Sequence, residues 1–228
     1  AHSCGEGLYD DESSDFSGDF AHYYDTIMRP FKKYILDAVA KVEGLPLRLI
    51  CPSHGPLLRR APRQAIDSYR KWSTLPATEG QQVLVLTISP HGNTRAMAAV
   101  VRKGLEEEGL TVVEKSIYGT SDAELRDAME LADALVVASP TVNRDAPPPV
   151  WHALSLLSTV TPRGRQAAVF GSYGWSGEAI KLIEERLKGL KFTLVVPGLS
   201  FRFKPTADDE KACLAFGRAV GAAVAQNG

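Results

Sequence analysis

The sequence lacks an excess of charge of either sign, a long apolar run and a leader-like start. Its 26 basic and 27 acidic residues leave a net charge of −1, so no strong field attracts nucleic acid or an anionic membrane. No apolar run approaches the roughly 20 residues that a membrane helix needs. The first residues are polar and acidic, unlike a signal peptide. We therefore expect neither nucleic acid nor a membrane among the partners.

Cysteine is also scarce. Cys4, Cys51 and Cys213 are odd in number and far apart, and no Cys-x-x-Cys pair occurs. This pattern disfavours a disulfide framework and a cysteine-built zinc site. We expect a soluble protein in a reducing compartment, which is the cytoplasm, or the chloroplast stroma if the chain comes from an alga or a plant.

The composition is that of a folded protein, and it changes between two regions of the chain. The 228 residues are 44% hydrophobic and 23% charged, which excludes a disordered chain. Charged helical stretches dominate before about residue 80, and apolar strands alternate with amphipathic helices after it. A stretch with Pro, Gly and polar residues separates the two patterns, as in a linker. We predict a first unit at residues 1–76, a linker at 77–82 and a second unit at 83–228.

Five apolar segments in the second unit have the character of buried strands. They are Val83–Ile88, Val112–Ile117, Ala134–Ala138, Gln166–Phe170 and Phe192–Val196. Amphipathic helices are expected between them, with a last helix from about Asp208 to Ala225. Strands that alternate with helices pair in parallel through right-handed crossovers. We predict an α/β fold with a flavodoxin-like, doubly wound sheet of five parallel strands in the order 2-1-3-4-5, preceded by a mostly helical region.

The loop after the first strand has the residues of a phosphate site. Ligands of such sheets bind beyond the carboxyl ends of the strands, and this loop, Ser89–Arg95, reads Ser-Pro-His-Gly-Asn-Thr-Arg. Hydroxyls, an amide and the N–H groups of the next helix can bind phosphate without a lysine, although a capped turn explains the same residues. The loop matches neither G-x-x-x-x-G-K-[ST] nor G-x-G-x-x-G, which disfavours a nucleoside triphosphatase and a dinucleotide site. The candidate contacts are Ser89, His91, Gly92, Asn93 and Thr94.

Two later loops favour a planar ligand. Ser139–Pro149 is stiffened by prolines, and Gly171–Ala179 places two aromatic residues between glycines. Such aromatic rings can pack against a flat ring system, although a stiff loop and core packing are the alternatives. The candidate ring contacts are Pro140, Thr141, Asn143, Ser172, Tyr173, Gly174, Trp175 and Gly177. A phosphate site beside a planar-ring site favours FMN as the cofactor.

Four stretches of the second unit carry a family resemblance, namely SPHGNTRAMA, SPTVNRDAPPP, GSYGWSGEAIKLIEERL and FRFKPTADDEKAC. The first three are similar to the flavodoxin domain of flavodiiron proteins, also termed A-type flavoproteins, and the fourth resembles the closing segment of that family. Ile50–Pro56 (ICPSHGP) resembles the end of the family's metallo-β-lactamase-like domain. The His-x-Cys-Gly near the start is closer to the oxygenic-phototroph branch. The resemblance covers nearly the whole chain.

The resemblance implies an oxidoreductase that reduces dioxygen to water, nitric oxide to nitrous oxide, or both. Electrons would come from a ferredoxin, a rubredoxin or an NAD(P)H-linked donor and pass through FMN to a diiron centre, and the intact protein would be a homodimer. His54 corresponds to the family's last iron ligand, whereas the H-x-E-x-D-H stretch and the other ligands have no counterpart here. We therefore expect a truncated protein that binds FMN, lacks the diiron centre and has no reductase activity at the family's rate.

Two other functions fit the sequence. A stand-alone flavodoxin-like electron carrier or quinone-reducing flavoprotein would not need residues 1–75, and an interaction module without cofactor would be colourless. Electron transfer itself requires no catalytic acid, base or nucleophile among the side chains. On the first unit we expect exposed aromatic residues that invite association. These are Tyr23, Tyr24, Phe31 and Tyr34.

Overall fold

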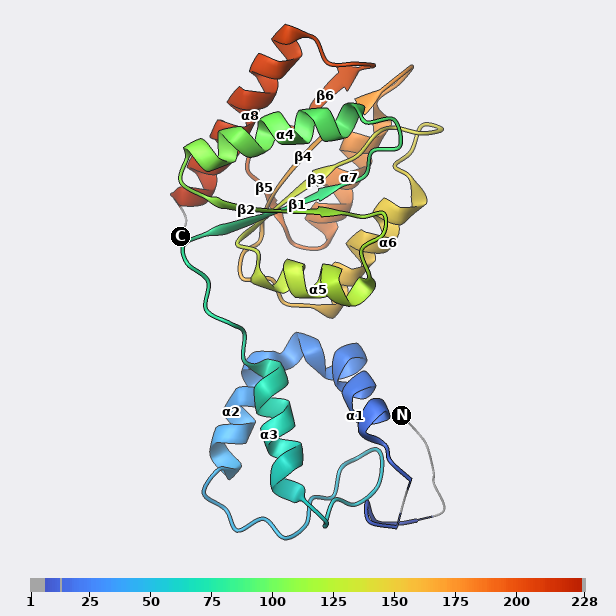
Figure 1. Ribbon diagram of the computed structural model, residues 1–228, viewed down its shortest axis with the longest axis vertical. Coiled ribbons are helices and arrows are strands. Elements are labelled where there is room, and N and C mark those ends of the chain that lie inside the picture. The colour runs from blue at the N-terminus through green and yellow to red at the C-terminus, as the bar shows by residue number, and fades with distance from the viewer. Residues whose placement is uncertain (1–6, 13, 227–228) are drawn as a thin grey trace. The chain divides into compact units, whose positions relative to one another are not determined.

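The computed structural model describes residues 7–12 and 14–226. The chain divides into two compact units, Ala1–Pro76 and Ala77–Gly228, which Figure 1 shows in one view. His2, Cys4 and the His-x-Cys-Gly stretch lie outside the described residues. Within the described part, no helix is both long enough and apolar enough to cross a membrane.

The second unit is built on a parallel sheet of six strands. They are β1 (Gln82–Thr87), β2 (Thr111–Ser116), β3 (Ala134–Ala138), β4 (Gln166–Tyr173), β5 (Thr193–Leu194) and β6 (Leu199–Arg202). The main path runs β2-β1-β3-β4-β5, and all of these pairs are parallel. The predicted order 2-1-3-4-5 is confirmed. Strand order reverses between β1 and β3, which is the place where ligands of doubly wound sheets bind.

The sheet edge beside β4 differs from the sequence prediction. The expected strand Phe192–Val196 is reduced to the two residues of β5, which pair with the start of β4. Pro197 has no N–H for a ladder, and the Gly198 N–H donates to the Glu184 carboxylate at 2.9 Å. A further strand, β6, then pairs with Phe170–Tyr173 at the end of β4. This edge of the sheet is therefore divided between β5 and β6. Phe203, which follows β6, lies at the carboxyl ends of the strands.

Helices cover both faces of the sheet. Their bounds are α4 (Asn93–Glu107), α5 (Asp122–Leu131), α6 (Pro148–Leu156, with a 3-10 turn at Leu157–Thr159), α7 (Glu178–Gly189) and α8 (Ala207–Ala225). Side chains of α4 and α8 form one apolar cluster with the sheet, and those of α5, α6 and α7 form the other. Figure 1 shows α4 and α8 on one side of the sheet and α5 and α6 on the opposite side. The apolar runs of β1 and β3 follow from this burial on both faces.

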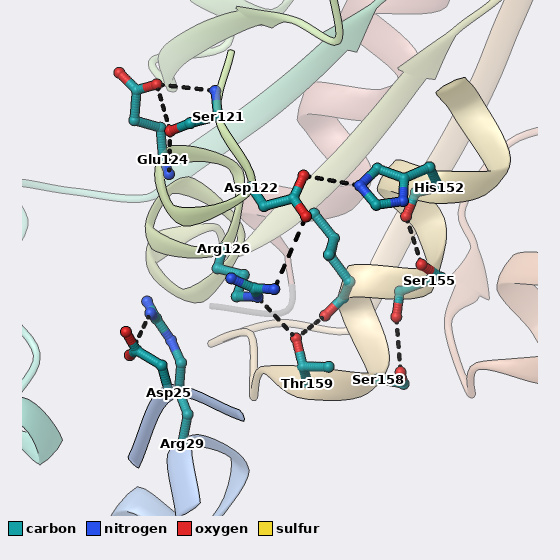
Figure 2. Close-up of polar contacts among 11 residues, drawn as sticks. Asp25, Arg29, Ser121, Asp122, Glu124, Arg126, His152, Ser155, Ser158 and Thr159 are labelled. Atoms are coloured by element: carbon teal, nitrogen blue, oxygen red, sulfur yellow. Dashed lines mark hydrogen bonds and ion pairs between the residues drawn. The ribbon is translucent and has the colours of Figure 1, made fainter. Parts of the chain in front are cut away.

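The start of α5 shows how local sequence positions a helix. Ser121 Oγ accepts a hydrogen bond from the Glu124 N–H, and the Glu124 carboxylate accepts one from the Ser121 N–H at 3.0 Å. The Ser121 hydroxyl and N–H hold the pKa of Glu124 below its usual value. Figure 2 shows this capping box together with the Asp122 carboxylate, which lies 2.8 Å from the His152 ring nitrogen on α6. A serine followed three residues later by a glutamate is the sequence pattern of such a box, so the start of this helix is encoded locally.

The first unit is helical and has a small core. It contains α1 (Ser17–Tyr23), a π-helical turn (Tyr24–Met28), a 3-10 turn (Arg29–Phe31), α2 (Lys32–Val42) and α3 (Pro62–Ser73). Tyr24, Ile35 and Val39 are buried together, with Tyr69 and Trp72 packed against them. Much of this contact is aromatic, since the Tyr24 ring centroid lies 5.3 Å from that of Tyr69 and 5.1 Å from that of Trp72.

The expected exposure of aromatic residues is only partly correct. Phe31 and Tyr34 are 49% and 71% exposed. Tyr23 is half-buried, and Tyr24 is only 2% exposed, so the expectation for Tyr24 is wrong. Its hydroxyl lies 2.9 Å from the Ser73 hydroxyl, which gives the buried phenol a polar partner.

Candidate functional site

The three predicted loops meet around one cavity at the carboxyl ends of β1, β3 and β4. Its volume is about 930 Å³, near the upper end of the roughly 300–1,000 Å³ of ligand pockets. Most of the predicted contacts line it, namely His91, Asn93, Pro140, Thr141, Asn143, Ser172, Tyr173, Gly174 and Trp175. The sequence reasoning did not include Pro90, Val142, Arg144, Ser176 and Phe203, which also line it.

The first loop presents a helix N-terminus to the cavity. Gly92 precedes α4 with a φ of +82°, a conformation that glycine adopts without strain. Gly92 has no side chain, so it provides no side-chain cap for α4. The Ser89 hydroxyl accepts a hydrogen bond from the Arg95 N–H at 3.1 Å. Ser89 and Gly92 thus shape the loop from outside the lining, while Asn93 in the first turn of α4 faces the cavity.

Thr94 lies behind the cavity wall. It is 1% exposed, and its hydroxyl oxygen is 2.9 Å from that of Ser172. Ser172 lines the cavity at the end of β4. This buried contact ties the first loop to the third and orients the Ser172 hydroxyl.

The second loop contains a tight hairpin turn. Val142 and Asp145 exchange two backbone hydrogen bonds of 2.8 and 3.0 Å. Between them, Asn143 and Arg144 have φ values of +51° and +64°. Two successive left-handed residues define a type I′ turn, in which Asn is favoured. The turn places both side chains on the cavity wall.

An ion pair connects the second loop to the third. Arg144 Nε donates to Glu178 Oε1 at 3.2 Å, in the first turn of α7. A hydrogen bond from the Ser176 hydroxyl, with help from the Glu178 N–H and Arg144, holds the pKa of Glu178 below its usual value. The Thr141 N–H donates to the Ser172 carbonyl at 2.8 Å. The two loops are therefore held as one wall.

The third loop and the end of β6 supply aromatic side chains. Trp175 is 94% exposed, so it is not packed in the core. A Cβ on Gly177 would lie 3.3 Å from the Tyr173 ring, which explains the glycine and shows that Gly177 stands behind Tyr173. Phe203 is 56% exposed and occupies a similar place against Gly174. No local signal identified Phe203, because the strand that delivers it was not predicted.

His54 belongs to the first unit. It lies beside a separate cavity of about 320 Å³, and its ring centroid is 5.9 Å from that of Tyr23. In residues 7–12 and 14–226, no three His, Cys, Asp or Glu side chains are placed to hold a metal ion. Non-haem iron requires several such ligands, so the described donor set does not fit a diiron centre.

A family model decides the assignment of the second unit. The model described as flavodoxin matches residues 85–217, which is more than half of the chain. The chain belongs to the flavodoxin family. The flavodoxin match contains the second half of β1, all of β3 and β4, and all three loops of the cavity.

Similarity to individual proteins extends beyond the flavodoxin domain. A type A flavoprotein of Rhodobacter capsulatus is 37% identical over 225 residues, covering 96% of this chain and 51% of that protein. The Flv1 flavodiiron core from Synechocystis is 28% identical, with a TM-score of 0.63 over 100% of this chain and 57% of the other. Rubredoxin oxygen:oxidoreductase from Desulfovibrio gigas is 25% identical, with a TM-score of 0.70 over 97% and 56%.

These comparisons confirm the resemblance to flavodiiron proteins. The match includes the helical unit as well as the flavodoxin domain, since it covers nearly the whole chain. The chain spans about half the length of the type A flavoprotein that it matches.

Proposed function

We propose that the flavodoxin domain of this chain binds FMN and transfers electrons through it. The observation that carries the proposal is one cavity lined both by Asn93, in the first turn of α4, and by the aromatic side chains Tyr173 and Trp175. The first feature favours a phosphate and the second a planar ring. When bound, FMN would supply the redox chemistry of its ring system.

The lining supports this assignment electrostatically. Arg144 is among the lining residues, and the described residues of the lining include no Asp or Glu. Glu178, which lies next to the cavity, is paired with Arg144. A phosphate therefore meets N–H groups, hydroxyls and an amide rather than an opposing carboxylate.

We assign the residues to two ends of the cavity. The phosphate end consists of Ser89, Gly92, Asn93 and Thr94, with Ser89 and Gly92 shaping the loop. The ring end consists of Pro140, Thr141, Asn143, Ser172, Tyr173, Gly174 and Trp175, with His91 beside it and Gly177 supporting Tyr173. These groups bind and orient the cofactor, and none of them has to move a proton for electron transfer.

We further propose that the chain works as the flavin-containing part of a flavodiiron-type oxidoreductase. Support comes from its similarity over 97% of its length to rubredoxin oxygen:oxidoreductase. Electrons would come from a small redox protein or an NAD(P)H-linked donor. His54 would serve as an iron ligand only where further ligands complete the site, so we assign no oxygen or nitric oxide reduction to the described residues.

A reducing compartment agrees with the thiols. Cys51 is exposed and Cys213 is buried, and both are unpaired in the described part of the chain. Burial, with the nearby Asp209 and Glu210, raises the pKa of Cys213 to about 12. The Cys213 thiol therefore stays protonated and unreactive.

The test is a flavin titration with iron quantified on the same sample. After FMN is added and excess removed, we expect flavin absorbance near one equivalent per chain and iron far below one equivalent. A chain that stays colourless with excess FMN would contradict the proposal. Iron near two equivalents would show that the ligand set had been misjudged.

Matched variants test the phosphate end separately. Asn93→Ala removes the amide that lines the phosphate end of the cavity, and we expect FMN affinity to fall about tenfold. Riboflavin, which has no phosphate, should bind the variant as it binds the original chain. Lys103→Ala, at an exposed site further along α4, serves as the control and should alter neither affinity. An equal loss of FMN and riboflavin affinity in Asn93→Ala would contradict this placement of the phosphate.

A further inference from the structure

Phe203 combines features that the fold alone does not require. Its φ is +60°, in the left-handed region that bulky residues avoid. Its side chain is 56% exposed, and it lines the cavity of the flavodoxin domain. An exposed apolar ring on a strained backbone is unfavourable in the chain by itself, and such strain concentrates at ligand sites.

The end of β6 holds Phe203 in this conformation. The Phe203 N–H donates to the Tyr173 carbonyl at 2.8 Å, directly after the last paired residue, Arg202. Arg202 Nε donates to the Gly174 carbonyl at 3.1 Å, and its guanidinium carbon lies 5.3 Å from the Phe203 ring centroid. The hydrogen bonds from the Phe203 N–H and from Arg202 Nε join the end of β6 to the third loop of the cavity.

The ring of Phe203 has a supporting surface behind it, whereas Trp175 does not. A Cβ on Gly174 would lie 3.3 Å from the Phe203 ring, so the ring packs directly on the backbone of the third loop. Trp175, in contrast, is 94% exposed. Phe203 is therefore the better positioned of the two side chains to form a fixed wall.

Another left-handed residue shows what a purely structural explanation looks like. Lys191 has a φ of +67° and lies just after α7. The Lys191 N–H donates to Lys188 and the Phe192 N–H to Leu187, the pattern by which a left-handed residue ends a helix. Phe203 follows a strand and ends no helix, so this explanation does not apply to it.

We propose that Phe203 is a ring contact of the bound flavin, delivered to the cavity by β6. The left-handed backbone turns its side chain from the sheet edge onto the cavity wall, where it offers an apolar surface to a planar ring. The inference rests on the proposed binding of FMN and adds a contact from outside the three predicted loops.

The test compares three variants of the full chain. Phe203→Gly removes the ring and the backbone strain at residue 203, and Phe203→Tyr keeps an aromatic ring. Lys191→Gly removes backbone strain at a position away from the cavity. For Lys191→Gly we expect a melting temperature about 2–4 °C higher and unchanged FMN affinity. For Phe203→Gly without flavin we expect a melting temperature no lower than that of the original chain.

Flavin affinity is the measurement that decides the proposal. Phe203→Gly should lower the affinities for FMN and for riboflavin by the same factor of about ten, since the lost contact is with the flavin ring. Phe203→Tyr should bind both within about threefold of the original chain. Fluorescence quenching of each free flavin measures these affinities.

The outcomes separate this inference from the proposed function. If the original chain does not bind FMN, the proposed function fails and this inference with it. If the original chain binds FMN and Phe203→Gly binds it equally well, only the role of Phe203 is overturned. A lower melting temperature of flavin-free Phe203→Gly, together with weaker flavin binding, would assign Phe203 a structural role and also overturn the proposal.

Discussion

The two units bury their apolar side chains in different ways. In the flavodoxin domain, a parallel sheet is covered on both faces, and side chains such as Val136 and Ile183 are fully buried. In the helical unit, Tyr24, Ile35 and Val39 form a small core that depends on aromatic neighbours. A unit with two covered sheet faces loses more when a core side chain is removed, because its interior cannot collapse around the gap.

Exposed ion pairs link segments of the helical unit that lie far apart in the sequence. In the helical unit, Arg59 Nε donates to Asp11 at 3.0 Å and its guanidinium donates to Glu12 at 2.8 Å. The same guanidinium lies 3.6 Å from the centroid of the Tyr9 ring. These exposed contacts connect the segment around residues 9–12 to the loop at Arg59. The helical unit thus adds exposed contacts to a core that is much smaller than the two apolar clusters of the flavodoxin domain.

The same substitution in both units gives the strongest test of this difference, and the largest effect is expected in the flavodoxin domain. Ile183→Ala removes a fully buried side chain of α7 and should lower the free energy of unfolding by about 2–5 kcal/mol. Hydrogen exchange measured by mass spectrometry reports each unit separately. Lys181→Ala, at an exposed site on α7, serves as the control and should leave exchange unchanged.

Ile35→Ala makes the matched change in the helical unit. Ile35 is 6% exposed in a small core that can contract, so we expect a cost of about 2 kcal/mol, at the low end of the range. Exchange in the flavodoxin domain should stay as in the original chain. Faster exchange in α7 after Ile35→Ala would show that the units share their stability, and an effect as large as that of Ile183→Ala would contradict the comparison.

A smaller effect is expected at the cap of α8. The Thr206 hydroxyl accepts a hydrogen bond from the Asp209 N–H, and the Asp209 carboxylate accepts one from the Thr206 N–H at 2.8 Å. Thr206→Ala should lower the free energy of unfolding by about 1 kcal/mol. Thermal unfolding of the original chain and the variant measures the difference.

This cap should also depend on pH. The Thr206 hydroxyl and N–H hold the pKa of Asp209 below its unfolded value of 3.8. A lowered pKa means that the contribution is present above the unfolded pKa and is lost as the pH falls through the folded pKa. The melting-temperature difference between the original chain and Thr206→Ala should be constant above roughly pH 5 and shrink below roughly pH 4. A difference that persists unchanged in acid would rule out this origin.

The smallest effect is expected for the exposed ion pairs of the helical unit. Arg59→Gln removes the contacts with Asp11 and Glu12 and should speed amide exchange around residues 9–12, with little change in global unfolding. Because salt screens exposed charges, the difference from the original chain should diminish at about 0.5 M salt. A large, salt-independent loss of stability would show that Arg59 matters through packing and would weaken the contrast between the units.

The fold of the second unit was largely predictable. The features that were missed depend on a strand too short to show a pattern or on a partner that is distant in the sequence. The apolar runs and the cap at Ser121 follow from periodicity and turn chemistry over a few residues, and the order of strands follows from the crossover rules of doubly wound sheets. β6 could not be predicted, because its four residues are too few to show a strand-like alternation. Phe203 was missed for the same reason. Tyr24 looked exposed because its partner Ser73 is 49 residues away.

Local sequence patterns specify the alternation of strands and helices, the helix caps and the three loops that form the cofactor site. Which side chains of those loops face the cavity depends on how the strands pack together. This packing turned the Thr94 hydroxyl toward Ser172, 78 residues away, placed Gly177 behind the Tyr173 ring and brought Phe203 to the wall from the split edge of the sheet. Local patterns act over one or two turns of chain, whereas these contacts exist only when distant strands pair in register.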